Sequence, residues 1–427
     1  MLVLEGKAYL KTGLQNCAIG IEDGKIFSIK KTLRADDRRD YNDMLLLPSG
    51  IDIHTHFRDP GLTYKEDFGS GSTAAACGGV TTAFDMPNTL PPTTTARRFA
   101  EKLKMAGKKS FIDFGLYGAL SIASETKNLA KIAHGFKLYL APTTGDLCVK
   151  TEDLDELLES VQSKGLPVIV HGEDSNKFGE QKATDLVEYN KSRPILAETS
   201  SVMLLKEKGK DYHMTHVTCT DMLGLTKGAG ITTDVTPHHL LLDCTMNLKA
   251  RGKVNPPLRP PAEREAMWKA FVEGRIEMVA SDHAPHTFEE KELDFLNAPA
   301  GIPGVETMMP LLLRKVRSMD LPLERLINAI CERPAELMGL SKGRIEEGMD
   351  ADIVVVDLRE VKLVKGKKLH SKCEWTPFEG WEAVFPRAVY LRGNLIVDKG
   401  EVVEDVLGKA VPTIASMSSS SEKEESD

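Results

Sequence analysis

Two histidines one residue apart, His54 and His56, close an apolar run near the start of the chain, in the sequence DIHTH. Successive side chains of a β-strand point to opposite faces, so these two imidazoles would lie on one face and point to one place. Imidazole binds Zn²⁺ well, and the same ligand type also accepts Mn²⁺, Fe²⁺ or Co²⁺. The pair alone is a weak signal, because two solvent-facing histidines would show the same spacing.

Four further apolar runs carry a polar side chain that could belong to the same site, at or near their C-terminal ends. They carry Lys137 in GFKLYLA, His171 in LPVIVH, His216 in YHMTHV and Asp282 in RIEMVASD. If these runs are strands of one parallel barrel, their C-terminal ends meet on the face where barrel enzymes build their active sites. Four histidines and a carboxylate at one barrel mouth predict a metal site.

Lys137 differs from the other members, because an ammonium in an apolar strand is costly to bury and cannot bind a cation. Carboxylation by CO₂ would convert it into an anionic carbamate whose two oxygens could bridge two metals, as in binuclear hydrolytic sites. The alternative is a lysine whose ammonium reaches the solvent at the barrel mouth.

Three polar residues follow these strands closely. Arg58 comes directly after the histidine pair, Asn88 follows the run VTTAFDM, and His286 stands four residues after Asp282. Arginine presents a planar donor fork suited to a carboxylate, so the sequence predicts an anionic substrate. The six other histidines are interpreted as structural, with His213 on the opposite strand face and His238 and His239 as candidates to orient a ligand; the set is His134, His213, His238, His239, His283 and His370.

These side chains need a scaffold, and the sequence supplies eight strand-like runs separated by helical or looped connections. They are LLLPSGIDIH, VTTAFDM, IDFGLYGA, GFKLYLA, LPVIVH, DYHMTHV, ITTDVT and RIEMVASD. Such alternation predicts an α/β fold, a (β/α)₈ TIM-type barrel, over residues 48–340.

Both ends of the chain show short alternating strands with glycine turns, at 1–47 and again within 341–412. We expect the two ends to form one small β-domain, antiparallel at its N-terminal part. The Ser-rich acidic segment 413–427 is predicted to be a disordered tail.

Composition excludes several classes of protein. Of the 427 residues, 41% are hydrophobic and 28% charged, with a net charge of -8, which is typical of a folded domain and unfavourable for nucleic acid. The chain shows no apolar run of membrane-spanning length, and its N-terminus lacks the apolar stretch of a signal peptide. Seven scattered cysteines without a C-x-x-C pair predict reduced thiols and, with the absence of a signal, a cytoplasmic protein.

In combination, HTHFRDPG, MPNT, FKLYLAP, VNPPLR, ASDHAPHTFEEK and GIPGVET resemble the class I dihydroorotases of the cyclic amidohydrolase superfamily. The resemblance spans nearly the whole chain, and FKLYL is similar to the branch with a carboxylated lysine. It implies two Zn²⁺ ions per subunit, bridged by carboxylated Lys137 and a hydroxide. The implied metal ligands are His54, His56, Lys137, His171, His216 and Asp282, and the implied substrate contacts are Arg58, Asn88, Asn255, His286, Pro303 and Gly304.

The implied reaction is the reversible cyclisation of N-carbamoyl-L-aspartate to L-dihydroorotate with loss of water, in pyrimidine (UMP) synthesis. Asp282 would be the catalytic residue, acting as general base and then as general acid. The alternatives are a hydantoinase, dihydropyrimidinase or allantoinase, for which Arg58 is unexpected because their rings are neutral, and a non-catalytic scaffold relative. The resemblance implies a small-molecule substrate and leaves open a homodimer and contact with aspartate transcarbamoylase.

Overall fold

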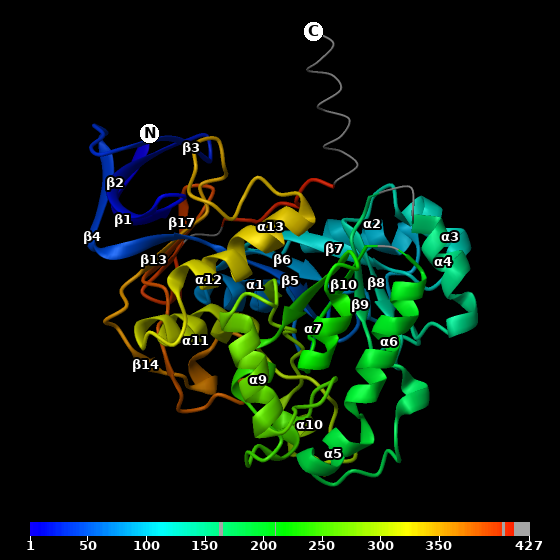
Figure 1. The fold of residues 1–427 in the computed structure, drawn as a ribbon. Helices are drawn as coiled ribbons and strands as arrows, with labels where there is room; N and C mark the ends of the chain where they lie inside the picture. Colours follow the sequence, from blue (N-terminus) through cyan, green and yellow to red (C-terminus); the bar gives the residue numbers. More distant parts are fainter. Residues whose placement is uncertain (162–164, 210, 404–405, 414–427) are drawn as a thin grey trace.

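The computed structural model describes residues 1–161, 165–209, 211–403 and 406–413. Its centre is a sheet of eight parallel strands that follow one another in chain order (Figure 1). They are β5 (Gly50–Thr55), β6 (Val80–Asp85), β7 (Asp113–Ala119), β8 (Gly135–Tyr139), β9 (Val168–His171), β10 (Tyr212–Met214), β11 (Ile231–Val235) and β12 (Met278–Val279). A parallel bridge between Thr55 and His283 joins the two edges, so the predicted TIM-type barrel is confirmed.

Helices connect and cover these strands, as parallel pairing requires. They are α1 (Phe68–Cys77), α2 (Ala96–Ala106), α3 (Ala123–Leu129), α4 (Leu154–Val161), α5 (Leu186–Ser192), α6 (Ile195–Glu207), α7 (Thr220–Thr226), α8 (Pro237–Leu241), α9 (Pro261–Val272), α10 (Phe288–Glu292), α11 (Val305–Arg317), α12 (Leu323–Ile327) and α13 (Arg333–Met338). The first of them begins at a capping box, in which the Asp67 carboxylate accepts from the Ser70 backbone N–H and the Ser70 hydroxyl accepts from the Asp67 backbone N–H. This cap ends the loop that leads out of the His54–His56 strand, and so fixes where that loop returns to the barrel wall.

All eight predicted runs contain a barrel strand, but β10 and β12 are much shorter than the runs DYHMTHV and RIEMVASD. The difference has a backbone cause. His216 and Asp282 adopt positive φ angles of 45° and 46°, which no regular strand allows. The chain therefore leaves the sheet just before the two residues whose side chains matter at the barrel mouth.

The two ends of the chain form one eight-stranded sheet beside the barrel, as predicted (Figure 1). Its order is β18 (Glu401–Val402), β17 (Asn394–Asp398), β16 (Ala388–Leu391), β13 (Ile353–Val356), β4 (Asp37–Pro48), β1 (Leu2–Leu10), β2 (Gly13–Glu22) and β3 (Lys25–Lys30). The expectation of purely antiparallel pairing at the N-terminal part is wrong, because β4 crosses back and pairs with β1 in parallel. The strand β14 (Lys362–Leu363) pairs separately with β15 (Glu382–Ala383), and the predicted tail lies, beyond residue 413, outside the described residues.

None of the helices in the described ranges combines the length and hydropathy needed to cross a membrane. All seven cysteines are unpaired, in agreement with the prediction of free thiols.

A buried lysine ties the barrel to the end sheet. Lys342 Nζ lies 2.7 Å from Asp352, 2.9 Å from Asp113 at the start of β7 and 3.0 Å from Asp350. Burial lowers the pKa of Lys342, but the three carboxylates outweigh burial and hold it above its ordinary value. The ammonium therefore stays charged and offsets carboxylates from both parts of the chain.

We expect Lys342→Met to lower the free energy of unfolding by about 3–5 kcal/mol, because it strands buried carboxylates without their cation. Denaturant unfolding followed by circular dichroism measures the loss. Lys25→Met is the matched control: Lys25 also pairs with Asp350, at 2.6 Å, but its side chain is 50% exposed, so its removal should cost less than about 1 kcal/mol. Equal losses in the two variants would show that the buried network does not hold the junction.

Candidate active site

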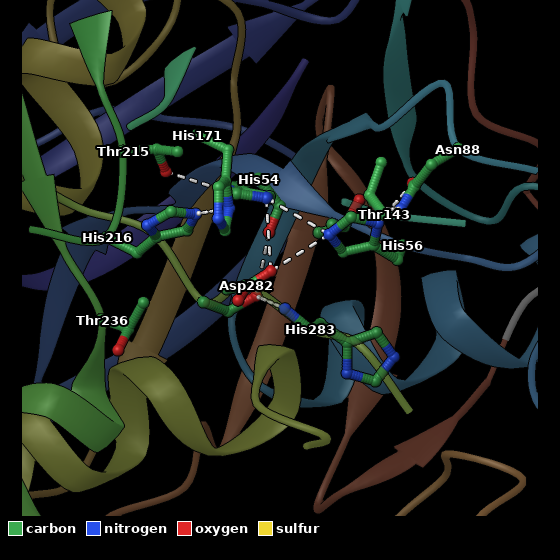
Figure 2. Close-up of polar contacts among 12 residues, drawn as sticks. His54, His56, Asn88, Thr143, His171, Thr215, His216, Thr236, Asp282 and His283 are labelled. Atoms are coloured by element: carbon green, nitrogen blue, oxygen red, sulfur yellow. Dashed lines mark hydrogen bonds and ion pairs between the residues drawn. The ribbon is translucent and has the colours of Figure 1, made fainter. Parts of the chain in front are cut away.

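Three of the predicted ligands meet at the C-terminal end of the barrel (Figure 2). His54 Nε2 and His56 Nε2 lie 3.2 Å and 3.1 Å from the same Asp282 oxygen. One ligand atom from each of the three residues falls within 4.8 Å of the others. Two imidazole nitrogens and a carboxylate oxygen converging on one point are a donor set that fits a divalent metal.

A second pair of predicted ligands, His171 and His216, lies beside the first group. His171 Nδ1 lies 3.0 Å from His216 Nε2, and the rings of His54 and His216 have centroids 5.3 Å apart. Burial comes first among the causes that lower the pKa of His54 and of His216 well below the ordinary value, followed by neighbouring histidines and Lys137. Both rings are therefore neutral, which is the form that binds a metal.

Lys137 occupies the middle of β8, fully buried, and its Nζ has no hydrogen-bond partner among the described residues. Burial lowers the pKa of Lys137 from 10.5 to about 7. A buried polar atom normally has a partner, so this one marks a place where a group outside the polypeptide belongs. With this pKa, the Lys137 amine is largely neutral near pH 8, and the neutral amine is the form that can react with CO₂.

Hydrogen bonds at Nδ1 leave the Nε2 atoms of two predicted ligands, His54 and His56, facing Asp282. His56 Nδ1 donates to Asn88 Oδ1 over 2.7 Å, so the lone pair of His56 is at Nε2, facing Asp282. His54 Nδ1 lies 2.6 Å from the Thr215 hydroxyl, which leaves its Nε2 facing Asp282 as well. Partners of this kind orient metal ligands and raise their affinity.

Glu173 orients His171 and was missed by the sequence analysis. Its carboxylate accepts from His171 Nε2 over 2.8 Å and also accepts from Arg193, so His171 presents Nδ1 toward His216. Burial would raise the pKa of Glu173, but Arg193 and His171 outweigh it and lower the pKa to about 2. The spacing His-x-Glu after a strand could have revealed this residue, because positions two apart share a face.

Three residues of the site carry a left-handed backbone. Arg58, His216 and Asp282 have φ values of 60°, 45° and 46°, although none of them is glycine. Such conformations cost about 1–3 kcal/mol each and persist where the surrounding structure imposes them, commonly at active sites. Here they turn each side chain from its strand end toward the barrel mouth.

The predicted carboxylate-binding residues Arg58 and His286 lie together and are both buried. Arg58 Nη2 is 3.1 Å from His286 Nε2, and Arg58 Nε donates to the carbonyl of Pro285. Within the described residues, the guanidinium of Arg58 donates to no carboxylate side chain, so its charge is available to an anion.

The other predicted substrate residues have protein partners. Asn88 joins His56 to the loop after β8, since its Nδ2 donates to Thr143 Oγ1 over 3.2 Å. Asn255 accepts from the Tyr189 hydroxyl, and Gly304, which follows Pro303, donates its N–H to His283 Nδ1 over 3.1 Å. The contacts of Asn88, Asn255, Pro303 and Gly304 with substrate stay predictions.

Most of the histidines interpreted as structural have hydrogen-bond partners away from the predicted metal ligands. His213 lies 2.8 Å from Asp234 and 2.9 Å from Thr232, and His239 contacts Thr236 and the carbonyl of Pro256. His134 accepts from the Leu116 backbone and donates to Val411 O, and His370 pairs with Glu306. His238 is buried, and its Nε2 has no partner among the described residues.

Comparison with known sequences agrees with this geometry. A model described as "Amidohydrolase family" matches residues 45–396. A protein of Methanosarcina acetivorans named dihydroorotase is 40% identical over 91% of this chain and 90% of its own length. A dihydroorotase of Thermoplasma acidophilum is 37% identical over 92% and 93%.

Solved structures give the same result for the fold. The L-hydantoinase of Arthrobacter aurescens has a TM-score of 0.91 at 29% identity, covering 96% of this chain and 99% of the other. The dihydropyrimidinase of Brevibacillus agri has a TM-score of 0.88 at 26% identity, covering 96% and 98%. The resemblance that the sequence motifs predicted is thus confirmed, and the chain belongs to the amidohydrolase family.

Proposed function

We propose that this protein is a dihydroorotase, which interconverts N-carbamoyl-L-aspartate and L-dihydroorotate in pyrimidine synthesis. The observation that carries the proposal is the buried pair of Arg58 and His286 beside the group of His54, His56 and Asp282. A carboxylate-sized anion held by this pair would place its ring at the metal-binding group. The archaeal relatives named dihydroorotase support the same reaction.

The proposal includes two Zn²⁺ ions, since the donor atoms fit such a group. His54, His56 and Asp282 would hold one side of the site, His171 and His216 the other, and carboxylated Lys137 the bridge. When bound, the metals would supply Lewis acidity at the ring amide and make water acidic enough to act as a nucleophile at neutral pH.

The residues of the chain would bind, orient and move protons. In the hydrolytic direction, Arg58 and His286 hold the substrate carboxylate, and their buried position strengthens that contact. Asp282 accepts the proton of the attacking water and delivers it to the leaving ring nitrogen, since one carboxylate can serve both steps. Asn88 and Glu173 keep the ligand histidines in one orientation and so fix the distance between nucleophile and ring.

A hydantoinase or dihydropyrimidinase is the second candidate, because the solved structures with these names share the fold closely. The substrates in these names are neutral rings, which offer no carboxylate to the buried Arg58 guanidinium beside His286. Turnover of dihydroorotate, hydantoin, dihydrouracil and allantoin, measured beside metal content, separates the candidates. Hydantoin turnover above dihydroorotate turnover would overturn the proposal.

We expect Arg58→Met to lower kcat/KM for dihydroorotate at least about tenfold, because a charge-assisted pair to the carboxylate is lost. The loss should be small for any neutral hydantoin that the enzyme hydrolyses. Steady-state kinetics with both substrates measures the difference. Equal losses on the two would remove Arg58 from the carboxylate site.

A cytoplasmic location, a homodimer and contact with aspartate transcarbamoylase also stay proposals. Sedimentation of the purified protein alone and with that enzyme tests the two assemblies directly.

A further inference from the structure

The loop 293–302, between α10 and α11, is held by two buried lysines, one of which is Lys291 near the end of α10. Lys291 Nζ donates to Pro299 O over 2.8 Å and to Gly301 O over 3.0 Å. It also has a longer contact of 3.4 Å with the carbonyl of Lys253. An ammonium carries three N–H donors, so each donor of Lys291 has an acceptor.

The second lysine, Lys253, binds the first half of the same loop. It is buried and lies two residues before the predicted substrate residue Asn255. Its Nζ donates, over 2.8, 3.1 and 2.8 Å, to the carbonyls of Phe295, Leu296 and Ala298. The Lys253 carbonyl in turn accepts from the Gly301 N–H over 2.9 Å. The loop is therefore tied to the segment VNPPLR from both of its halves.

Backbone carbonyls are unusual partners for two buried charges. Within the described ranges, both ammonium groups donate to carbonyls and neither pairs with a carboxylate. A buried ammonium is costly unless its donors are satisfied, and the same holds for buried carbonyls without a donor. Removal of either charge would leave inward-facing carbonyls unpaired, and the loop would turn them toward water. The conformation of the loop thus depends on Lys253 and Lys291.

The end of this loop packs against the proposed carboxylate site. Ala300 O lies 3.0 Å from His286 Nε2, and the Ala284 N–H donates to Ile302 O over 2.8 Å. At Gly301 the approach is so close that a Cβ would lie 2.5 Å from Ala284 O and 3.0 Å from His286 Nε2. The two carbonyls that Lys291 binds in the loop belong to the residues on either side of Ala300.

Lys291 also contacts a residue that holds the backbone of His286. Its Nζ lies 5.6 Å from the centre of the Trp375 ring, and the indole N–H of Trp375 donates to His286 O over 2.8 Å. The side chain and the backbone of His286 are thus both contacted by groups that touch Lys291.

We propose that Lys253 and Lys291 are positioning residues that keep the loop 293–302 in place against His286 before substrate binds. The inference rests on the proposed function, and both lysines act through the loop and not by contact with the substrate. A loop that is already ordered adds no ordering cost to binding. Because that cost would be equal for the bound substrate and the transition state, the lysines should affect KM and not kcat.

Lys291→Met tests the proposal, because it keeps most of the side-chain volume and removes all three donors. We expect KM for dihydroorotate to rise at least about tenfold, since ordering the backbone of one residue on binding costs about that factor. In the same variant kcat should stay within about twofold. Lys253→Met should raise KM less, because the loop carbonyls that Lys291 binds flank Ala300 directly. Steady-state kinetics measures both constants.

Lys342→Met is the matched control, because Lys342 is also a buried lysine with three acceptors but lies at the junction of the barrel and the end sheet. It should lose stability and keep KM within about twofold. An equal increase of KM in this control, or a fall of kcat at unchanged KM in Lys291→Met, would overturn the proposal. Unchanged KM in both loop variants would do the same. The two lysines are replaced separately, so Lys253→Met decides the outcome if Lys291→Met does not fold.

Hydrogen exchange needs no turnover and so separates this inference from the proposed function. In the metal-loaded enzyme without substrate, peptides covering 293–303 should exchange at least about tenfold faster in Lys291→Met, with the barrel strands unchanged. Lys342→Met should not show this local increase. Equal exchange of the loop in Lys291→Met and the unmodified enzyme would refute the inference, whatever the substrate proves to be. Faster exchange in an enzyme that does not turn over dihydroorotate would support the inference and overturn only the proposed function.

Discussion

Asp282→Asn is expected to lower kcat about 10²–10⁴-fold, the usual contribution of a positioned general acid and base. The amide keeps the shape of the carboxylate but cannot accept the proton of the attacking water. Asparagine is also one of the few residues that tolerates a left-handed backbone, so the φ of 46° at this position should survive. The loss then reports the chemistry of the side chain and not a rearranged loop.

Asp282 is also a proposed metal ligand, so activity has to be compared with metal content in the same sample. A loss of kcat much larger than the loss of metal supports proton transfer by Asp282. Activity that falls only in proportion to metal would make Asp282 a ligand alone. Asp243→Asn, which changes another buried carboxylate that accepts from Thr245 and lies near Arg264, is the control and should keep both.

The barrel could be predicted from the sequence because parallel strands buried on both faces appear as apolar runs. The pairing within the end sheet could not, because the parallel contact of β1 with β4 depends on which way a crossover passes. The early ends of β10 and β12 also escaped prediction. The runs YHMTHV and RIEMVASD remain apolar past the point where positive φ angles at His216 and Asp282 break the pairing.

Some residues of the candidate site could also be predicted from the sequence, and others could not. Residues at strand ends, such as His54, His171 and Asp282, are predictable because the fold brings strand ends together. Glu173 was missed because charged residues usually stay at the surface, although its position two residues after His171 was a usable signal. Its role in orienting His171 follows from the hydrogen bond between the two side chains in the structure.

The second large effect is expected for Lys137→Met, which should stabilise the metal-free protein but weaken the metal-loaded one. In the metal-free state its Nζ is buried without a partner, so Lys137→Met should raise the free energy of unfolding by about 1–3 kcal/mol. With metal present, the same variant lacks the bridging anion and should bind metal at least about 100-fold more weakly. Activity should fall with the metal, and metal should no longer stabilise the protein.

Lys102→Met is the matched control, because Lys102 is equally buried but pairs with Asp85 and donates to the carbonyl of Met86. It should lose stability in both states. If Lys137 were an ordinary structural lysine, its variant would behave like this control.

Lys137→Ala leaves space for a bridging ligand, so added acetate or propionate should restore part of its metal content and activity. Electron density ending at the Lys137 amine, in metal-loaded active enzyme kept under CO₂, would refute the carbamate.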